Sequence, residues 1–226
     1  KFTEILKKEL AGWKKSEVII LSVILAAIII HAFIRDDSKI ALISAVCGIL
    51  YTTIAGKGKS SCYLFGLCSS ACYSYLSFIN ALYGNLILNI GYYIPAQILG
   101  FFSWNKNFKQ NTRDIIKTKL NQKERISLII AGIAGSIITI FTLKYFNDSN
   151  AIIDGITTFL SILGMYLTVK RCIEQWVIWM IVNGLSVIMW TNIVLHGTKA
   201  YSAVFMWAIY FVFAIYFYLK WRKEVK

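Results

Sequence analysis

The run VIILSVILAAIII, from Val18 to Ile30, decides the fold class, because every residue in it except one serine is apolar. No small-residue cleavage site follows it before His31 and Arg35, so we interpret it as a membrane span and not as a cleavable signal peptide. The whole chain has a similar bias: of 226 residues, 58% are apolar and 15% are charged. Soluble domains contain about 25% charged residues, so the sequence predicts an all-α integral membrane protein.

Eight stretches of the chain are long and apolar enough to be spans, because a helix needs about 20 mostly apolar residues to cross the hydrocarbon core. They cover residues 17–34, 39–56, 60–79, 83–104, 126–146, 151–169, 175–195 and 200–220. We therefore expect about eight transmembrane helices.

The basic residues orient these spans, because cytoplasmic loops of membrane proteins collect Lys and Arg. With both termini in the cytoplasm, 20 of the 24 Lys and Arg residues fall on the cytoplasmic side. This placement also explains the net charge of +13, so we expect no nucleic-acid partner. The five cysteines form no CxxC pair, and no Cys/His group has metal-ligand spacing. We therefore expect neither a disulfide framework nor a metal or other cofactor.

Amide and aromatic side chains gather in the seventh span. Trp176, Trp179 and Asn183 are spaced three and four residues apart, which places them on one face of a helix. Such a face can stack against a flat ring and hydrogen-bond to it. From this span alone, an equally good interpretation is that the tryptophans pack between helices and Asn183 forms an interhelical hydrogen bond.

The fourth span carries a second polar group. Pro95 is the only proline of the chain and predicts a kink that redirects the side chains near it. Gln97 follows it within a turn, and Tyr93, Asn89 and Asn85 precede it. Together with the seventh span, these residues favour a binding function over simple helix packing.

The chemistry of the spans argues for a transporter and against an enzyme. No Asp, Glu, Lys or Arg lies near the middle of any expected span, whereas a proton-coupled carrier needs a titratable group inside the membrane. There is no GxSxG or HExxH motif. We expect an uncoupled facilitator for a small flat molecule that is neutral or carries a delocalised cation, although sodium coupling through amides and carbonyls stays open.

The order of the spans suggests an internal repeat. Spans two to four and six to eight can be superposed at an offset of 116 residues, with one span between them. The triplets then have the same orientation, as in transporters with parallel repeats. The expected parts are an N-terminal interfacial segment with an extra helix (1–36), a first three-helix bundle (39–104), a basic cytoplasmic loop with a linker helix (105–147), and a second three-helix bundle with a basic tail (151–226).

The stretch YGNLILNIGYYIPAQILGFFSW from Tyr83 to Trp104, the motif Trp179-x-x-x-Asn183 and the end of the last span resemble the PnuC family of nicotinamide riboside transporters. The resemblance implies a SWEET-like arrangement of three helices, a linker helix and three helices, here with an extra N-terminal helix. It also implies a homotrimer in the bacterial inner membrane.

In function, the resemblance implies facilitated diffusion of nicotinamide riboside, with uptake driven by phosphorylation in the cytoplasm. Trp179, Asn183 and Gln97 match the substrate positions of the family. The spacing alone adds four candidate substrate-binding residues, which are Trp176, Tyr93, Asn85 and Asn89. Thiamine or riboflavin remains an alternative substrate, and a binding-only membrane subunit that captures a vitamin remains an alternative function.

Overall fold

The computed structural model describes residues 12–35, 38–79, 83–107, 114–146, 150–195 and 201–225. All regular elements in this part of the chain are helices, as predicted. The chain divides into two compact units, Lys1–Ile116 and Lys117–Lys226. Most of the expected N-terminal interfacial segment, up to position 11, lies outside the described residues.

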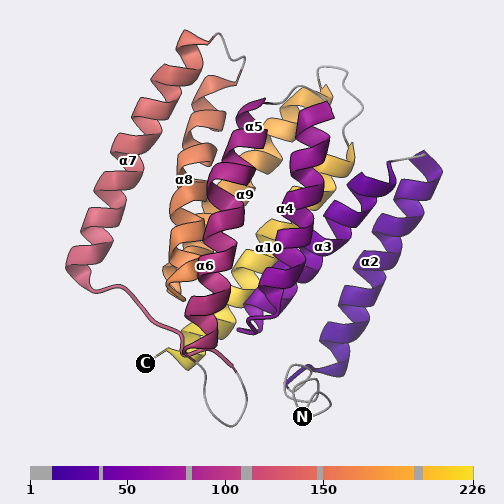
Figure 1. Ribbon diagram of the computed structural model, residues 1–226, viewed down its shortest axis with the longest axis horizontal. Coiled ribbons are helices and arrows are strands. Elements are labelled where there is room, and N and C mark those ends of the chain that lie inside the picture. Colours follow the sequence, from indigo (N-terminus) through magenta and orange to yellow (C-terminus); the bar gives the residue numbers. More distant parts are fainter. Residues whose placement is uncertain are drawn as a thin grey trace. The chain divides into compact units, whose positions relative to one another are not determined.

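The first unit contains α2 (Lys15–Arg35), α3 (Lys39–Gly56), α4 (Cys62–Ile79), α5 (Tyr83–Leu88), the π turn η1 (Asn89–Tyr93) and α6 (Ile94–Asn105). Figure 1 shows α5 and α6 as one rod, with η1 between them. Helix α4 packs between α3 and this rod, and α2 contacts α3. Reciprocal hydrogen bonds join α3 to α4, because each of Ser44 and Ser69 donates its hydroxyl to the other's carbonyl.

The second unit contains α7 (Gln122–Tyr145), α8 (Ala151–Val169), α9 (Glu174–Leu195) and α10 (Tyr201–Glu224), each packed against the next. Helix α7 begins at a capping box, in which Asn121 and Glu124 each accept the other's backbone N–H. Its glycines let α8 approach: a Cβ on Gly135 would lie 2.1 Å from Cζ of Phe159.

The helices agree with the expected spans in position. Among the described residues, six helices are long and apolar enough to cross a membrane, and Glu174–Met189 is a shorter apolar helix. The third expected span, 60–79, corresponds to α4, which has 18 residues. The chain is therefore a multi-pass helical membrane protein, whereas the count of eight spans stays a prediction.

One helix in each unit ends with the same kind of turn. After α3 and after α8, one residue adopts a left-handed backbone, Gly58 with φ of 74° and Arg171 with φ of 62°. The next residue donates its N–H to a carbonyl five positions back, which is the Schellman motif. Gly58 and Arg171 lie 113 positions apart in the sequence, so these turns correspond at a slightly shorter offset than the 116 expected from the sequence alone.

The segment 114–121 binds to these turns mainly through its backbone. In the first unit, Ile115 N–H donates to the Gly58 carbonyl at 2.9 Å. In the second unit, Thr118 N–H donates to the Arg171 carbonyl at 3.0 Å, and Thr118 accepts from Ile173 N–H at 2.9 Å. These bonds satisfy a segment that has no helix or sheet of its own.

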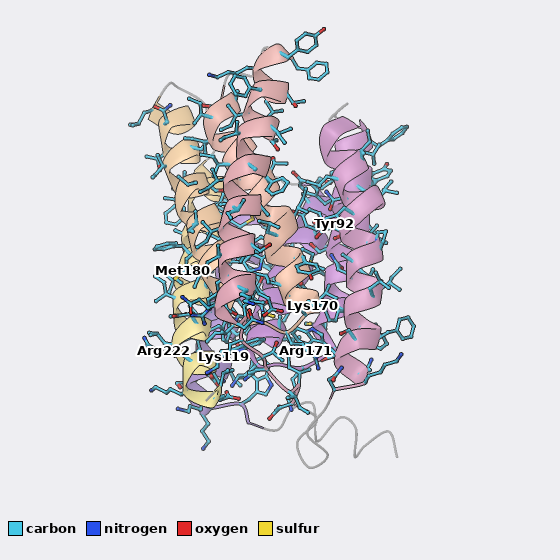
Figure 2. The ribbon with its side chains drawn as sticks, turned by 90° about the vertical axis from the view of Figure 1, so that its left-hand side faces the viewer. Tyr92, Lys119, Lys170, Arg171, Met180 and Arg222 are labelled. Carbon is cyan, nitrogen blue, oxygen red and sulfur yellow. The ribbon has the colours of Figure 1, made fainter. Side chains whose placement is uncertain are left out.

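Charged groups gather at this turn in the second unit. Figure 2 shows the side chains of Lys119, Lys170, Arg171 and Arg222 at the same end of that unit. The turn also contains Cys172, which is buried, and this burial raises the pKa of its thiol. A concentration of Lys and Arg at one end of a membrane bundle is typical of its cytoplasmic side.

Candidate functional site

The face of α9 predicted from sequence has Asn183 close to the midpoint of the helix. Trp179 lies one turn before it on this face and Trp176 lies nearly two turns before it, because residues three and four apart share a face. The structure gives the three side chains different environments, which separate Trp176 from Trp179 and Asn183.

Trp179 is held against α8 by its N–H edge. Its indole Nε1 donates to the hydroxyl Oγ1 of Thr168 at 3.3 Å. The six-membered ring lies over Gly164, where a Cβ would be 3.0 Å from Cε2 of the indole. The side chain is partly exposed. With its N–H occupied, the indole can offer a ligand its ring face but not a hydrogen bond.

Asn183 is a buried residue whose amide has no hydrogen-bond partner among the described residues. The residue is 5% exposed, and no hydrogen bond to its side chain occurs within the described part of the chain. Gln175 on the same helix gives the contrast, since it is 1% exposed and its Nε2 donates to the Cys172 carbonyl at 3.0 Å. Among the described residues, the fully buried polar atoms without a partner do not include those of the Asn183 amide, so this amide still reaches open space, where a ligand could bond to it.

Trp176 belongs to the interface between α9 and α10. It is 3% exposed, and its ring lies 5.3 Å from Phe217 and 5.6 Å from Trp221. Its Nε1 is buried and has no hydrogen-bond partner in the described residues. The structure thus gives Trp176 a packing role beside α10 and does not place its ring with that of Trp179.

In the first unit, Gln97 links α6 to α4. Its Nε2 donates to Ser70 Oγ at 2.8 Å, while its Oε1 is buried with no hydrogen-bond partner among the described residues. The amide fits because Gly66 has no side chain: a Cβ there would lie 2.7 Å from Oε1. Gln97 therefore joins two helices through its Nε2, while its Oε1 is still available as an acceptor within the described residues.

The fourth span widens into a π turn where the sequence predicts a proline kink. Pro95 has no N–H to donate to the carbonyl four residues back, and Ile94 N–H bonds to the Asn89 carbonyl five residues back. In a π turn, residues four apart fall nearly in line, so Asn89 and Tyr93 lie on one face. Asn89 is 7% exposed and Tyr93 is partly exposed. The Asn85 side chain lies outside the described residues.

Each unit thus carries its own candidate residues: Asn89, Tyr93 and Gln97 in the first, and Trp179 and Asn183 in the second. The substrate-binding candidates from sequence do not include Ser70 and Thr168, the hydroxyls that hold Gln97 and Trp179. The only sequence signal for Thr168 is its position four residues after Gly164, since threonine hydroxyls often bond to the carbonyl four residues earlier.

The amides and aromatic rings of both groups of candidate residues have the chemistry that recognises a flat ligand. Among the described residues, no group of three His, Cys, Asp or Glu side chains could hold a metal ion. Amides offer donors and acceptors without charge, and an indole face attracts flat rings and delocalised cations.

Comparisons with known proteins agree with this chemistry. The family described as nicotinamide mononucleotide transporter matches residues 38–223. A protein of Neisseria mucosa named nicotinamide riboside transporter PnuC is 32% identical, and the match covers 97% of this chain and 86% of the relative. A protein of the same name from Haemophilus influenzae is 30% identical, with 98% and 96% covered.

A solved structure has the same fold. The crystal structure of the vitamin B3 transporter PnuC superposes with a TM-score of 0.82 and 31% sequence identity. The superposition covers 96% of this chain and 95% of that chain.

Proposed function

This chain belongs to the nicotinamide mononucleotide transporter family and is a multi-pass membrane transporter, and we propose that its substrate is nicotinamide riboside. Two relatives with about a third of their residues identical to this chain carry that substrate in their names. The substrate has a flat pyridinium ring with a carboxamide, joined to a ribose with free hydroxyls.

The observation that carries the proposal is the amide of Asn183, buried at the centre of α9 and without a partner in the described residues. An amide of this kind can donate to and accept from the carboxamide of the substrate. One turn away, Trp179 offers a ring face to the pyridinium cation. The pairing of a cation-attracting ring with a bidentate amide fits nicotinamide riboside.

Among the other candidates, Gln97 supports the proposal through its unused acceptor, and Asn89 and Tyr93 through their shared face. We retain Asn85 from its spacing in the sequence. Trp176 acts through packing, since its contacts with α10 hold the first turns of α9 in place.

We also propose that transport is uncoupled, and that cytoplasmic phosphorylation traps the substrate. The absence of Asp, Glu, Lys and Arg near the middle of the expected spans supports this mechanism. We place the protein in the bacterial inner membrane with both termini in the cytoplasm, since the basic residues gather there, and we retain the homotrimer as a proposal.

Calorimetric titration of the detergent-purified protein with nicotinamide riboside, thiamine and riboflavin in parallel tests the substrate. We expect heat of binding from nicotinamide riboside, and Asn183→Ala should weaken it. Heat from thiamine or riboflavin alone would overturn the substrate assignment.

Uptake into proteoliposomes tests transport itself. We expect nicotinamide riboside to equilibrate across the vesicle membrane without an added energy source. Tight binding without uptake would instead identify a capture subunit of a larger importer.

A further inference from the structure

The hydroxyl of Thr168 takes part in two hydrogen bonds, as the donor in one and the acceptor in the other. Its Oγ1 donates to the Gly164 carbonyl at 2.8 Å and accepts the N–H of Trp179 at 3.3 Å. A hydroxyl has one proton, so its donation to Gly164 leaves an acceptor facing the indole. The residue is 2% exposed, so water does not compete for this acceptor.

Gly164 lets the same indole pack closely against α8, because glycine has no side chain. A Cβ at this position would lie 3.0 Å from Cε2 and 3.2 Å from Cζ2 of Trp179. The edge of the indole therefore lies directly on the backbone of α8. One residue fixes the ring by a hydrogen bond, and another, one turn earlier on the same helix, fixes it by close packing.

We propose that Thr168 and Gly164 are positioning residues that set the plane of the Trp179 ring for stacking on the pyridinium of the substrate. The proposal rests on the function proposed above and extends it. Trp179 then contributes a ring face in a fixed orientation, and all directional hydrogen bonds to the substrate come from other residues. An indole fixed before binding loses less conformational freedom when the substrate arrives.

A purely structural role for the Thr168 bond makes a different prediction. If the bond only joins α8 to α9, its loss should lower stability and affect all ligands of the site alike. If the bond orients the ring, its loss should affect cationic ligands most, because attraction to the face of an indole requires the charge to lie over that face.

The test variant is Thr168→Val, which keeps the shape of the side chain and removes the hydroxyl. We expect its Kd for nicotinamide riboside to rise roughly fivefold, and Thr168→Ser to restore binding to within about twofold. The matched control is Thr157→Val. Thr157 lies on the same helix, is 8% exposed and donates to the Ile153 carbonyl, and it has no hydrogen bond to an indole within the described residues.

The decisive measurement is the ratio of affinities for nicotinamide riboside and for its uncharged, reduced dihydropyridine form. We expect Thr168→Val to lower the preference for the cation, and Thr157→Val to leave it unchanged. If Thr168→Val does not fold, Gly164→Ala tests the same idea, because a methyl group there displaces the indole without altering the hydroxyl.

The outcomes separate the two proposals. Normal binding by Trp179→Ala and Asn183→Ala would overturn the proposed function. Weakened binding by those variants, with the cation preference of Thr168→Val and Gly164→Ala equal to that of the wild type, would overturn the positioning role alone.

Discussion

Replacement of Asn183 by leucine should weaken substrate binding and leave the protein at least as stable. The two side chains have equal numbers of non-hydrogen atoms, so the change removes the amide without opening a cavity. Because Asn183 has no hydrogen-bond partner in the described residues and is 5% exposed, its replacement breaks no hydrogen bond within the described part of the protein. Leucine fills the same volume with apolar atoms, so the midpoint of thermal unfolding without substrate should rise or stay unchanged.

Binding should change in the opposite direction. In the proposed complex the amide forms one or two hydrogen bonds with the substrate, each contributing about 1 kcal/mol. Their loss corresponds to a Kd roughly five to thirty times higher. Calorimetric titration with nicotinamide riboside measures Kd, and thermal unfolding of the same sample without substrate measures stability.

Gln175→Leu is the matched control on the same helix. Gln175 is also buried, but its amide donates to the Cys172 carbonyl, so its loss should lower stability by about 1 kcal/mol and leave Kd unchanged. The reasoning would be refuted if Asn183→Leu destabilised the protein as much as Gln175→Leu does and still bound substrate normally.

Three further predictions concern the turns and the mechanism. Arg171→Gly should stabilise the protein by about 1 kcal/mol, because glycine adopts a φ of 62° without strain; a lower unfolding temperature would contradict this. Uptake by vesicles should persist when the proton gradient is collapsed, since no Asp, Glu, Lys or Arg lies near the middle of an expected span, and abolished uptake would exclude the uncoupled mechanism. Burial raises the pKa of the Cys172 thiol, so alkylation of Cys172 in the folded protein should be slow at neutral pH and accelerate only above the ordinary pKa range of thiols. Mass spectrometry can follow this labelling, and rapid labelling at pH 7 would argue against burial.

The positions of the spans could be predicted because hydropathy and charge act on whole helices. The expected spans 39–56 and 151–169 coincide with α3 and α8. Over twenty residues the cost of placing polar groups in lipid outweighs local preferences. The same reasoning identified the amides, since a polar side chain inside a span is conspicuous.

The partners of those amides could not be predicted. Whether Gln97 bonds to Ser70 depends on the rotation of α6 against α4 and on the space above Gly66. A periodic pattern places Trp176 and Trp179 on one face, but only packing determines that the first ring meets α10 and the second meets α8. Such partners depend on tertiary packing, and the amino-acid composition of a helix does not determine which of its faces meets which neighbour.

The π turn at Asn89–Tyr93 makes the length of the fourth span matter as much as its composition. Deletion of a single residue there would let the helix close with ordinary α spacing. Gly91 is suited to such a deletion, because a Cβ on it would meet nothing within 4 Å. The turn closed by the bond from Ile94 N–H to the Asn89 carbonyl holds one residue more than an α turn, so this deletion would leave Asn89 on nearly the same side of the rod relative to Gln97. A deletion in α6 between Pro95 and Gln97 would instead turn everything before it by about 100°, so the π turn is a place where the span can lose a residue and keep its polar face.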